Sequence, residues 1–240
     1  MTLKPHFEEL DYQQTRLGEL VLRRRTLLSL GNRKIYEVKL GEAYLMSSLF
    51  HESEAALADI ALRELEGTGW EIVVGGLGLG YTAAAALKYP QLERLIVVEA
   101  LAPVIDWHRR GLVPNGKTLT HDARCEYRHA DFFELARGGG FDPHVQGARF
   151  DAVLLDIDHT PQSWLHGSHA DLYSEAGLHR LKAFLKPDGI FALWSNDAPQ
   201  ERFLRRLSAV FARAEGREIQ FDNPLQQTVS TNGVYIARSR

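Results

Sequence analysis

The chain has 240 residues, of which 45% are hydrophobic and 25% are charged, and its formal net charge is −3. This composition is ordinary for a globular protein of one large or one-and-a-half domains. The small negative charge argues against nucleic acid as a partner, and the single Cys125 excludes an intramolecular disulfide framework. No apolar stretch is as long as a transmembrane helix, and residues 1–10 lack the apolar run of a signal peptide. We therefore expect a cytoplasmic protein that does not contact a membrane.

The first fifty residues have the pattern of a small β unit. Residues 1–16 are mixed and polar, and we expect them to form an irregular lead-in. Two extended runs follow, 17–30 and 35–48, and the Gly and Asn within residues 31–34 supply a turn between them. These runs predict a small antiparallel sheet.

A helix is predicted over residues 53–66, because apolar residues recur there at helical spacing and Ser53 can act as the N-cap. Gly67 is expected to end this helix. We place a domain boundary in front of this helix, between an N-terminal β-hairpin unit of residues 1–52 and a larger domain of residues 53–240.

The larger domain is organised around a strand, a glycine-rich turn, a helix and a second strand. The strands are predicted over residues 71–74 and 95–98, and the alanine-rich helix over residues 82–89. The glycines of the turn are Gly75, Gly76, Gly78 and Gly80. Glycines let the backbone approach a ligand closely, and a helix N-terminus points free N–H groups at it. Glu99, which ends the second strand, can accept hydrogen bonds from both ribose hydroxyls of a nucleoside; the alternative is a structural turn with a solvated Glu99.

The spacing of these glycines bears on the identity of the nucleoside. Gly76, Gly78 and Gly80 form GxGxG, and no GxGxxG frame falls naturally on the turn, so the dinucleotide fingerprint is not met. GxGxG followed by an acid at the end of the next strand resembles the class I S-adenosylmethionine fold. We therefore expect S-adenosylmethionine or its decarboxylated form, with NAD as the alternative.

Strands and helices continue to alternate after Glu99. Further strands are predicted over residues 124–129, 150–155 and 190–194, helices over 103–110, 172–185 and 199–214, and a terminal antiparallel pair over 217–221 and 233–237. This alternation predicts a mainly parallel sheet with helices on both faces. Because ligands lie at the carboxyl ends of such strands, the glycine turn, Glu99, Asp131 and Asp156 should share one rim.

Each acid of this rim has a functional and a structural interpretation. Asp131 would accept a hydrogen bond from the adenine amino group, with Phe132 packing against the base; alternatively Asp131 is a helix N-cap. Asp156 follows an apolar run and would act as a general base or as an anchor for a cationic acceptor. Its alternative is a loop-capping aspartate.

The loop of residues 158–171 contains side chains of metal-ligand type, namely Asp158, His159, His166, His169 and Asp171. Their spacing matches no familiar site, so we expect no metal. We expect instead a mobile polar lid, in which Trp164 and Leu165 cover the acceptor and exclude water. His159 is either a second acid–base group or an exposed loop histidine.

Taken together, these motifs resemble the spermidine synthases and their bacterial spermidine-synthase-like relatives, from about residue 17 to the carboxyl terminus. The resemblance is carried by KIYEVKLGEAYLMSS, VVGGLGLGYT, LIVVEALAPVIDWHR, YRHADFFE, FDAVLLDID and LYSEAGLHRLKAFLKPDGIFALW. It implies an N-terminal β unit, a Rossmann-like domain and often a dimer. It also implies that Glu99 binds ribose, that Asp131 binds adenine and that Asp156 assists the attack of an amine.

The chain also departs from that family. Spermidine synthases carry an aspartate in the glycine turn that holds the aminopropyl end, and the matching residue here is Gly78. The second Asp and the Pro of their gate loop are His159 and Thr160 here, and their Tyr-Gln pair at the diamine appears as Ser53 and Glu54. The nucleoside half of the site is kept, and the diamine half is not.

The sequence thus predicts an α/β protein with a Rossmann-like class I methyltransferase fold and a small N-terminal antiparallel β unit. Its predicted activity is a nucleoside-dependent group transfer in which Asp156 and His159 are the catalytic residues and a small molecule such as an amine is the acceptor. Methyl transfer from S-adenosylmethionine is favoured because the acid at the aminopropyl end is missing. Aminopropyl transfer from decarboxylated S-adenosylmethionine is the alternative, and a non-catalytic nucleoside-binding protein is a second one. We expect a homodimer.

Overall fold

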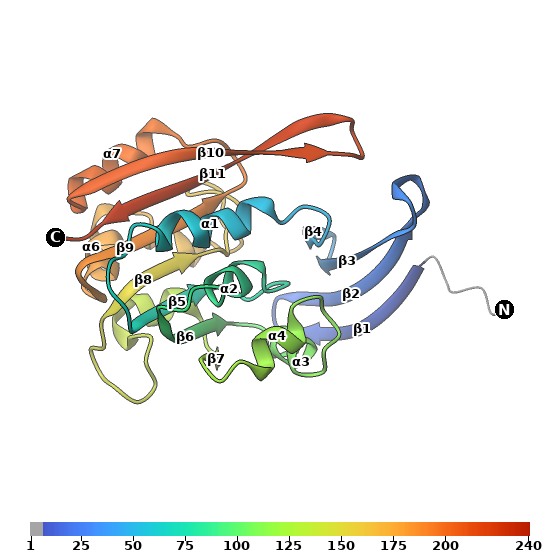
Figure 1. Cartoon of the computed structure of the whole chain (residues 1–240), viewed down its shortest axis with the longest axis horizontal. Helices are drawn as coiled ribbons and strands as arrows, with labels where there is room; N and C mark the ends of the chain where they lie inside the picture. The colour runs from blue at the N-terminus through green and yellow to red at the C-terminus, as the bar shows by residue number, and fades with distance from the viewer. Residues whose placement is uncertain (1–6) are drawn as a thin grey trace.

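The structure is a computed structural model that describes residues 7–240. It contains two sheets, one of four antiparallel strands and one of seven mostly parallel strands. Figure 1 shows the small sheet on the right, beside the carboxyl ends of the parallel strands of the larger sheet. The rim on which the sequence places its candidate residues therefore faces the N-terminal sheet.

The N-terminal sheet is a meander in which each strand pairs with the next. Its strands are β1 (Phe7–Thr15), β2 (Gly18–Leu27), β3 (Arg33–Leu40) and β4 (Ala43–Ser47), with a short 3-10 helix η1 (Leu28–Leu30) between β2 and β3. The expectation of an irregular lead-in is wrong for residues 7–15, which pair with β2; residues 1–6 lie outside the described part of the chain. The sequence of β1, FEELDYQQT, lacks the alternation of apolar and polar residues that marks most strands, and none of its side chains is fully buried.

The N-terminal sheet shares a hydrophobic core with the larger sheet. Leu20, Leu22 and Val38 are buried in the same cluster as Leu57 of helix α1. A hydrogen bond of 2.6 Å from the indole Nε1 of Trp107 to Asp11 adds a polar link. Burying apolar surface stabilises such packing by about 25 cal/mol per Å². The shared core therefore holds the small sheet against the rim.

The larger sheet has the strand order β10-β11-β9-β8-β5-β6-β7. Its strands are β5 (Trp70–Gly75), β6 (Leu92–Glu99), β7 (Cys125–His129), β8 (Phe150–Leu155), β9 (Leu185–Ser195), β10 (Arg213–Asn223) and β11 (Thr228–Arg238). Strands β5 to β9 pair in parallel, whereas β11 pairs antiparallel with β9 and with β10. The predicted fold class is confirmed.

Helices cover both faces of this sheet. They are α1 (Glu52–Leu62), α2 (Tyr81–Ala86), α3 (Ala102–Arg109), α4 (Gly116–His121), α5 (Phe132–Glu134), α6 (Glu175–Lys182) and α7 (Glu201–Val210), with short helices η2 (Leu135–Gly139) and η3 (Gly167–Asp171). Ile72 and Val74 of β5 join the cluster that contains α1 to α4, and Val73 joins the cluster with α5 to α7. Alternate residues of one strand thus fill the cores on its two faces, as a buried parallel strand requires.

Several elements differ from the prediction. Helix α4 was not predicted, because its sequence GKTLTH is polar and lacks a helical apolar stripe. The terminal hairpin is about twice as long as predicted, and Figure 1 shows it projecting past the sheet toward the N-terminal unit. Ser53 does not cap α1, which begins at Glu52 after His51, and its hydroxyl is used elsewhere.

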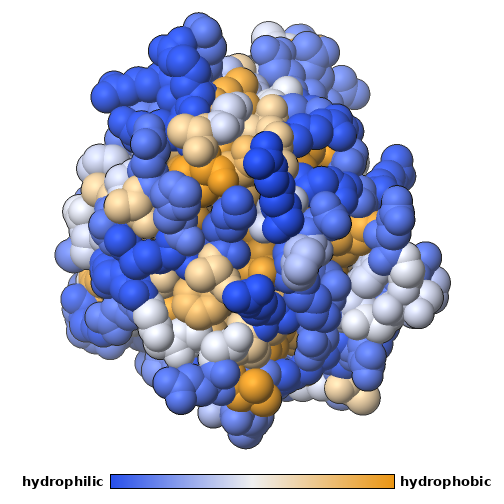
Figure 2. Space-filling view, turned by 90° about the vertical axis from the view of Figure 1, so that its left-hand side faces the viewer, coloured by the Kyte–Doolittle hydropathy of each residue, from blue (hydrophilic) through white to orange (hydrophobic). Residues whose placement is uncertain are grey.

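The surface agrees with a globular protein. Figure 2 looks at the side that lies to the left in Figure 1 and shows a mainly hydrophilic face, on which apolar residues form separate patches. Among the described residues, no helix is both long and apolar enough to cross a membrane.

Candidate active site

The glycine turn between β5 and α2 adopts a conformation that other residues rarely take. The φ angles of Gly76, Gly78 and Gly80 are +95°, +48° and +83°. The Gly76 N–H donates to the Val98 carbonyl at 2.9 Å, which ties the turn to β6. His108 adds a contact of 3.0 Å between its ring Nε2 and the Gly78 carbonyl oxygen. These contacts hold the turn in a fixed conformation.

Replacing Gly76 with alanine is expected to displace this turn. A Cβ at Gly76 would overlap the carbonyl oxygen of Asp156, in addition to the strain of a positive φ. We expect Gly76→Ala to lower the free energy of unfolding by about 2 kcal/mol or more, measured by urea denaturation. Gly147→Ala is the matched control, because Gly147 has a φ of +72° but open space around it. Equal losses in the two variants would show that overlap with Asp156 does not matter.

Glu99, at the end of β6, is bonded to the turn that precedes it in the chain. Its Oε2 accepts the Leu77 N–H at 3.0 Å, and its Oε1 accepts the Leu101 N–H at 2.8 Å. Burial raises the pKa of the Glu99 carboxyl, and the backbone hydrogen bonds oppose that rise. The structure thus brings together the turn and the acid predicted to bind ribose, and the ribose contact itself stays a prediction.

Asp131 and Phe132 lie at the end of the neighbouring strand β7. The Asp131 carboxylate accepts the Phe133 N–H at 2.8 Å, so the alternative role as N-cap of α5 is confirmed. Adenine recognition by Asp131 stays a prediction. The role predicted for Phe132 is wrong, because its side chain is only 1% exposed and packs inside the core against Phe141 and beneath Gly75. A ring in that position supports the turn and presents no face to a base.

Asp156 follows β8 and lies beside the glycine turn. Its backbone N–H donates to the Gly75 carbonyl at 2.8 Å, and its Oδ2 accepts the Thr82 hydroxyl at 2.7 Å. Burial raises the pKa of the Asp156 carboxyl, although the hydrogen bond from Thr82 lowers it. A carboxylate held in this way is near the protonation range of a general base that works at neutral pH.

Asp156 lines a pocket between the larger sheet and the N-terminal sheet. The other lining residues are Leu45, Met46, Ser47, Glu54, Leu77, Gly78, Leu79, Gly80, Tyr81, Ile157, His159, Leu165 and Trp194. The walls are mostly apolar, and Glu54 is the second acid. His159 lies in the lining as predicted, and its acid–base role stays a prediction.

Most of the lining residues were not predicted as site residues, among them Met46, Trp194 and Glu54. Met46 comes from β4 and packs against Gly78, where a Cβ would lie 2.8 Å from its sulfur. Trp194 ends β9, and its indole Nε1 donates to the Ser53 hydroxyl at 2.9 Å; Ser53 in turn donates to the Asn232 side chain. Glu54 follows Ser53 on α1. The rule that strand ends form the rim could have identified Trp194, but only the tertiary structure brings β4 and α1 to the pocket.

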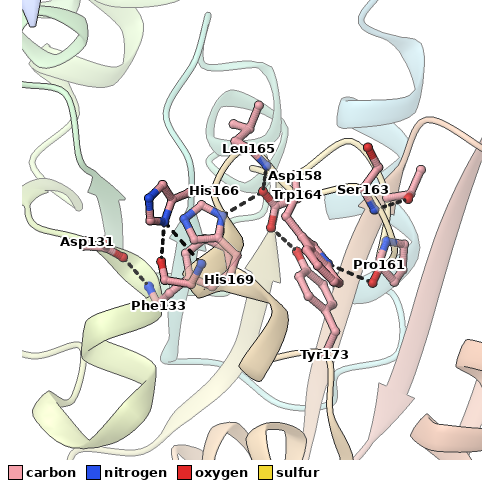
Figure 3. A network of polar contacts seen from close by, with 12 residues as sticks. Asp131, Phe133, Asp158, Pro161, Ser163, Trp164, Leu165, His166, His169 and Tyr173 are labelled. Carbon is pink, nitrogen blue, oxygen red and sulfur yellow. Dashed lines mark hydrogen bonds and ion pairs between the residues drawn. The ribbon is translucent and has the colours of Figure 1, made fainter. Parts of the chain in front are cut away.

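The loop of residues 158–171 is anchored from within (Figure 3). The buried Asp158 carboxylate accepts hydrogen bonds of 2.8 Å from the Leu165 N–H, the His169 ring and the Tyr173 hydroxyl. His169 also stacks on Phe133 with 3.6 Å between ring centroids. These hydrogen bonds give the Asp158 carboxylate a structural role in the loop. No group of three candidate metal ligands occurs within the described residues.

The predicted lid residues behave differently from each other. Leu165 lines the pocket, as predicted. Trp164 is 40% exposed, and its indole donates to the Pro161 carbonyl at 3.0 Å, so it does not contribute to the pocket wall in this structure. Of the two predicted lid residues, Leu165 is therefore the one that lines the pocket.

Comparisons with known proteins agree with this architecture. No protein-family model matches the chain. A polyamine aminopropyltransferase of Nitrosomonas europaea is 30% identical over 122 residues, which cover 51% of this chain and 34% of that protein. The match therefore spans about a third of the length of that relative.

Solved structures match over nearly the whole chain. A spermidine synthase in complex with the transition-state analogue AdoDATO has a TM-score of 0.74 at 18% identity, covering 97% of this chain and 74% of that one. The spermidine synthase of Thermotoga maritima has a TM-score of 0.72 at 18% identity, covering 97% and 73%. A probable spermidine synthase of Corynebacterium glutamicum has a TM-score of 0.65 at 17% identity, covering 98% and 81%. The chain has the spermidine-synthase-like fold that its sequence motifs predicted.

Proposed function

We propose that the chain is a transferase that uses decarboxylated S-adenosylmethionine and transfers its aminopropyl group to an amine. The observation that carries the proposal is Asp156, a carboxylate held beside the glycine turn in a mostly apolar pocket. The matches to spermidine synthases and to an aminopropyltransferase favour this alternative over the methyl transfer that the sequence first indicated.

The turn fits a nucleoside with a short tail. Gly78 and Gly80 line the pocket with bare backbone, and the Glu99 carboxylate is fixed at the neighbouring strand end. We assign the ribose hydroxyls to Glu99, which ends β6, and the adenine amino group to Asp131, which follows the adjacent strand β7. When bound, decarboxylated S-adenosylmethionine supplies an electrophilic carbon next to a sulfonium.

The chemical task of the protein is to deliver a neutral amine. A primary ammonium has a reference pKa near ~10.4 and cannot attack until it loses a proton. Asp156 attracts the ammonium and accepts that proton, and the Thr82 hydroxyl holds the receiving carboxylate in place. Leu165, Met46 and Trp194 surround the site with apolar surface, which excludes water and fixes the approach of the amine.

Several further assignments belong to the same proposal. In this proposal the N-terminal unit of residues 1–52, whose described part contains the antiparallel meander, closes the site, and residues 53–240 form the catalytic domain. The proposal also makes the protein a homodimer that works in the cytoplasm. Its mass in solution, measured by size-exclusion chromatography with light scattering, tests the homodimer.

Calorimetric titration with three nucleosides tests the proposal. Decarboxylated S-adenosylmethionine and methylthioadenosine are expected to bind more tightly than S-adenosylmethionine, since the pocket lining offers no Lys or Arg to pair with the carboxylate of the latter. Turnover with diamines should then release methylthioadenosine. Preference for S-adenosylmethionine would instead support methyl transfer, and tight binding without turnover on any amine would support the non-catalytic alternative.

A further inference from the structure

The pocket contains two carboxylates and no cationic side chain to neutralise them. Glu54 of α1 and Asp156 at the end of β8 both line it, and none of the described lining residues is Lys or Arg. Two partly buried like charges repel each other and lose hydration, so one of them favours its protonated form. The site is therefore short of positive charge.

We propose that Glu54 is a substrate-binding carboxylate, which holds a cationic amine together with Asp156, and that the two acids share one proton until the cation displaces it. The inference rests on the proposed function and adds to it a second binding residue and a proton released on binding. Glu54 thereby supplies a negative charge at a site where residue 78 is glycine.

The packing of the first turn of α1 supports this role. The Thr82 hydroxyl, which donates to Asp156, also lies 3.2 Å from the backbone carbonyl oxygen of Glu54, so the first turn of α1 packs against the residue that holds Asp156. The Ser53 hydroxyl lies 3.1 Å from the Glu54 carboxylate and accepts the Trp194 indole N–H. Glu54 thus belongs to a positioned network and is not a freely rotating surface acid.

The lining around Gly78 explains why the charge of Glu54 is needed. Met46 occupies the space next to Gly78, so the wall there is a thioether and the backbone of the turn. A thioether offers an ammonium only weak attraction, whereas a carboxylate forms a charge-assisted hydrogen bond with it. Glu54 and Asp156 are therefore the pocket's means of binding an amine.

The titratable groups that face the pair are a tyrosine, a glutamate and a histidine. Burial, and then the charge of Asp156, raise the pKa of the Glu54 carboxyl to about 8. Burial raises the pKa of the Tyr81 phenol to about 12, so Tyr81 is neutral; the charge of Arg33 of β3 opposes that rise. The remaining facing groups are Glu52 on α1 and the lining residue His159.

Amine binding in two buffers of different ionisation enthalpy tests the shared proton. With 1,4-diaminobutane as the probe, methylthioadenosine present and pH 7.5, we expect the wild type to release about one proton for each amine bound. Glu54→Gln should release almost none and bind the amine about 10-fold to 100-fold more weakly, with unchanged affinity for methylthioadenosine. The matched control is Glu66→Gln, because Glu66 is an exposed acid just after the same helix and does not line the pocket, and it should behave like the wild type.

A second measurement does not depend on any amine. Because the folded-state pKa of Glu54 lies above its unfolded value, its protonated form stabilises the protein below pH 4.5, and this contribution is lost as the pH rises toward about 8. Glutamine does not titrate, so the melting temperature of Glu54→Gln relative to the wild type should rise between pH 5 and pH 8. An unchanged difference over this range would refute the shared proton.

The outcomes separate the two proposals. If the wild type turns over diamines and Glu54→Gln binds them equally well, Glu54 is not a substrate-binding residue but the proposed function stands. If the melting-temperature difference rises with pH and the wild type binds no amine, the acids share a proton but the amine-binding role and the proposed acceptor class are both wrong.

Discussion

Substitution of Asp156 by asparagine is expected to reduce turnover by about 10³-fold, the range typical of a positioned general base. The amide keeps the size of the side chain and can still accept the Thr82 hydroxyl, but it cannot take a proton from an ammonium. Affinity for methylthioadenosine should stay within about twofold, because Glu99 and the turn hold the nucleoside. Single-turnover kinetics and calorimetry measure the two effects separately.

The control for this variant is Asp222→Asn, an exposed aspartate on β10, which should retain full activity. Thr82→Val provides a graded version of the same experiment. Losing the Thr82 hydrogen bond removes an interaction that lowers the pKa of Asp156, so the acid limb of the pH–rate profile should move to higher pH. Normal turnover in Asp156→Asn would remove Asp156 from the mechanism.

The second large effect is expected from Glu99→Ala. The carboxylate is the ribose ligand in our assignment, and it also holds the Leu77 N–H in the turn. Two charge-assisted hydrogen bonds to the ribose diol are worth about 3 kcal/mol together, so nucleoside affinity should fall by about 100-fold. The affinity for methylthioadenosine, measured by calorimetry, checks this expectation.

Two further variants separate ribose binding from support of the turn. Glu99→Gln keeps an acceptor for one backbone N–H but carries no charge, so its affinity should lie between those of the wild type and Glu99→Ala. Glu93→Ala, an exposed acid at the start of the same strand, should bind like the wild type. A Glu99→Ala variant with normal nucleoside affinity would contradict the ribose assignment.

Local sequence patterns were sufficient for the parallel sheet and its turn. The apolar run that forms β5, the glycines after it and the acid that ends β6 each depend on neighbours in the chain, through strand propensity and the φ freedom of glycine. The rule that ligands meet the carboxyl ends of parallel strands then assigned Glu99, Asp131 and Asp156 to one rim before any contact was known.

Phe132 illustrates where that reasoning failed. A hydrophobic residue next to a predicted ligand acid can face either the ligand or the core, and sequence position alone does not distinguish them. The orientation of α5 turns Phe132 inward beneath Gly75, where burial is more favourable than contact with water. Strand β1 was missed for a related reason, since its partial burial leaves no apolar alternation to read.

The sequence by itself thus determined the fold class, the glycine cradle and the acids at the strand ends, because these depend on interactions between close neighbours. The tertiary structure alone decided the other half of the pocket. It brings Met46 from β4, Glu54 from α1 and Trp194 from β9 to Asp156, and residues so far apart in sequence leave no periodic signal. Their meeting depends on the packing of the N-terminal sheet and α1 over the rim, which is a property of the whole core.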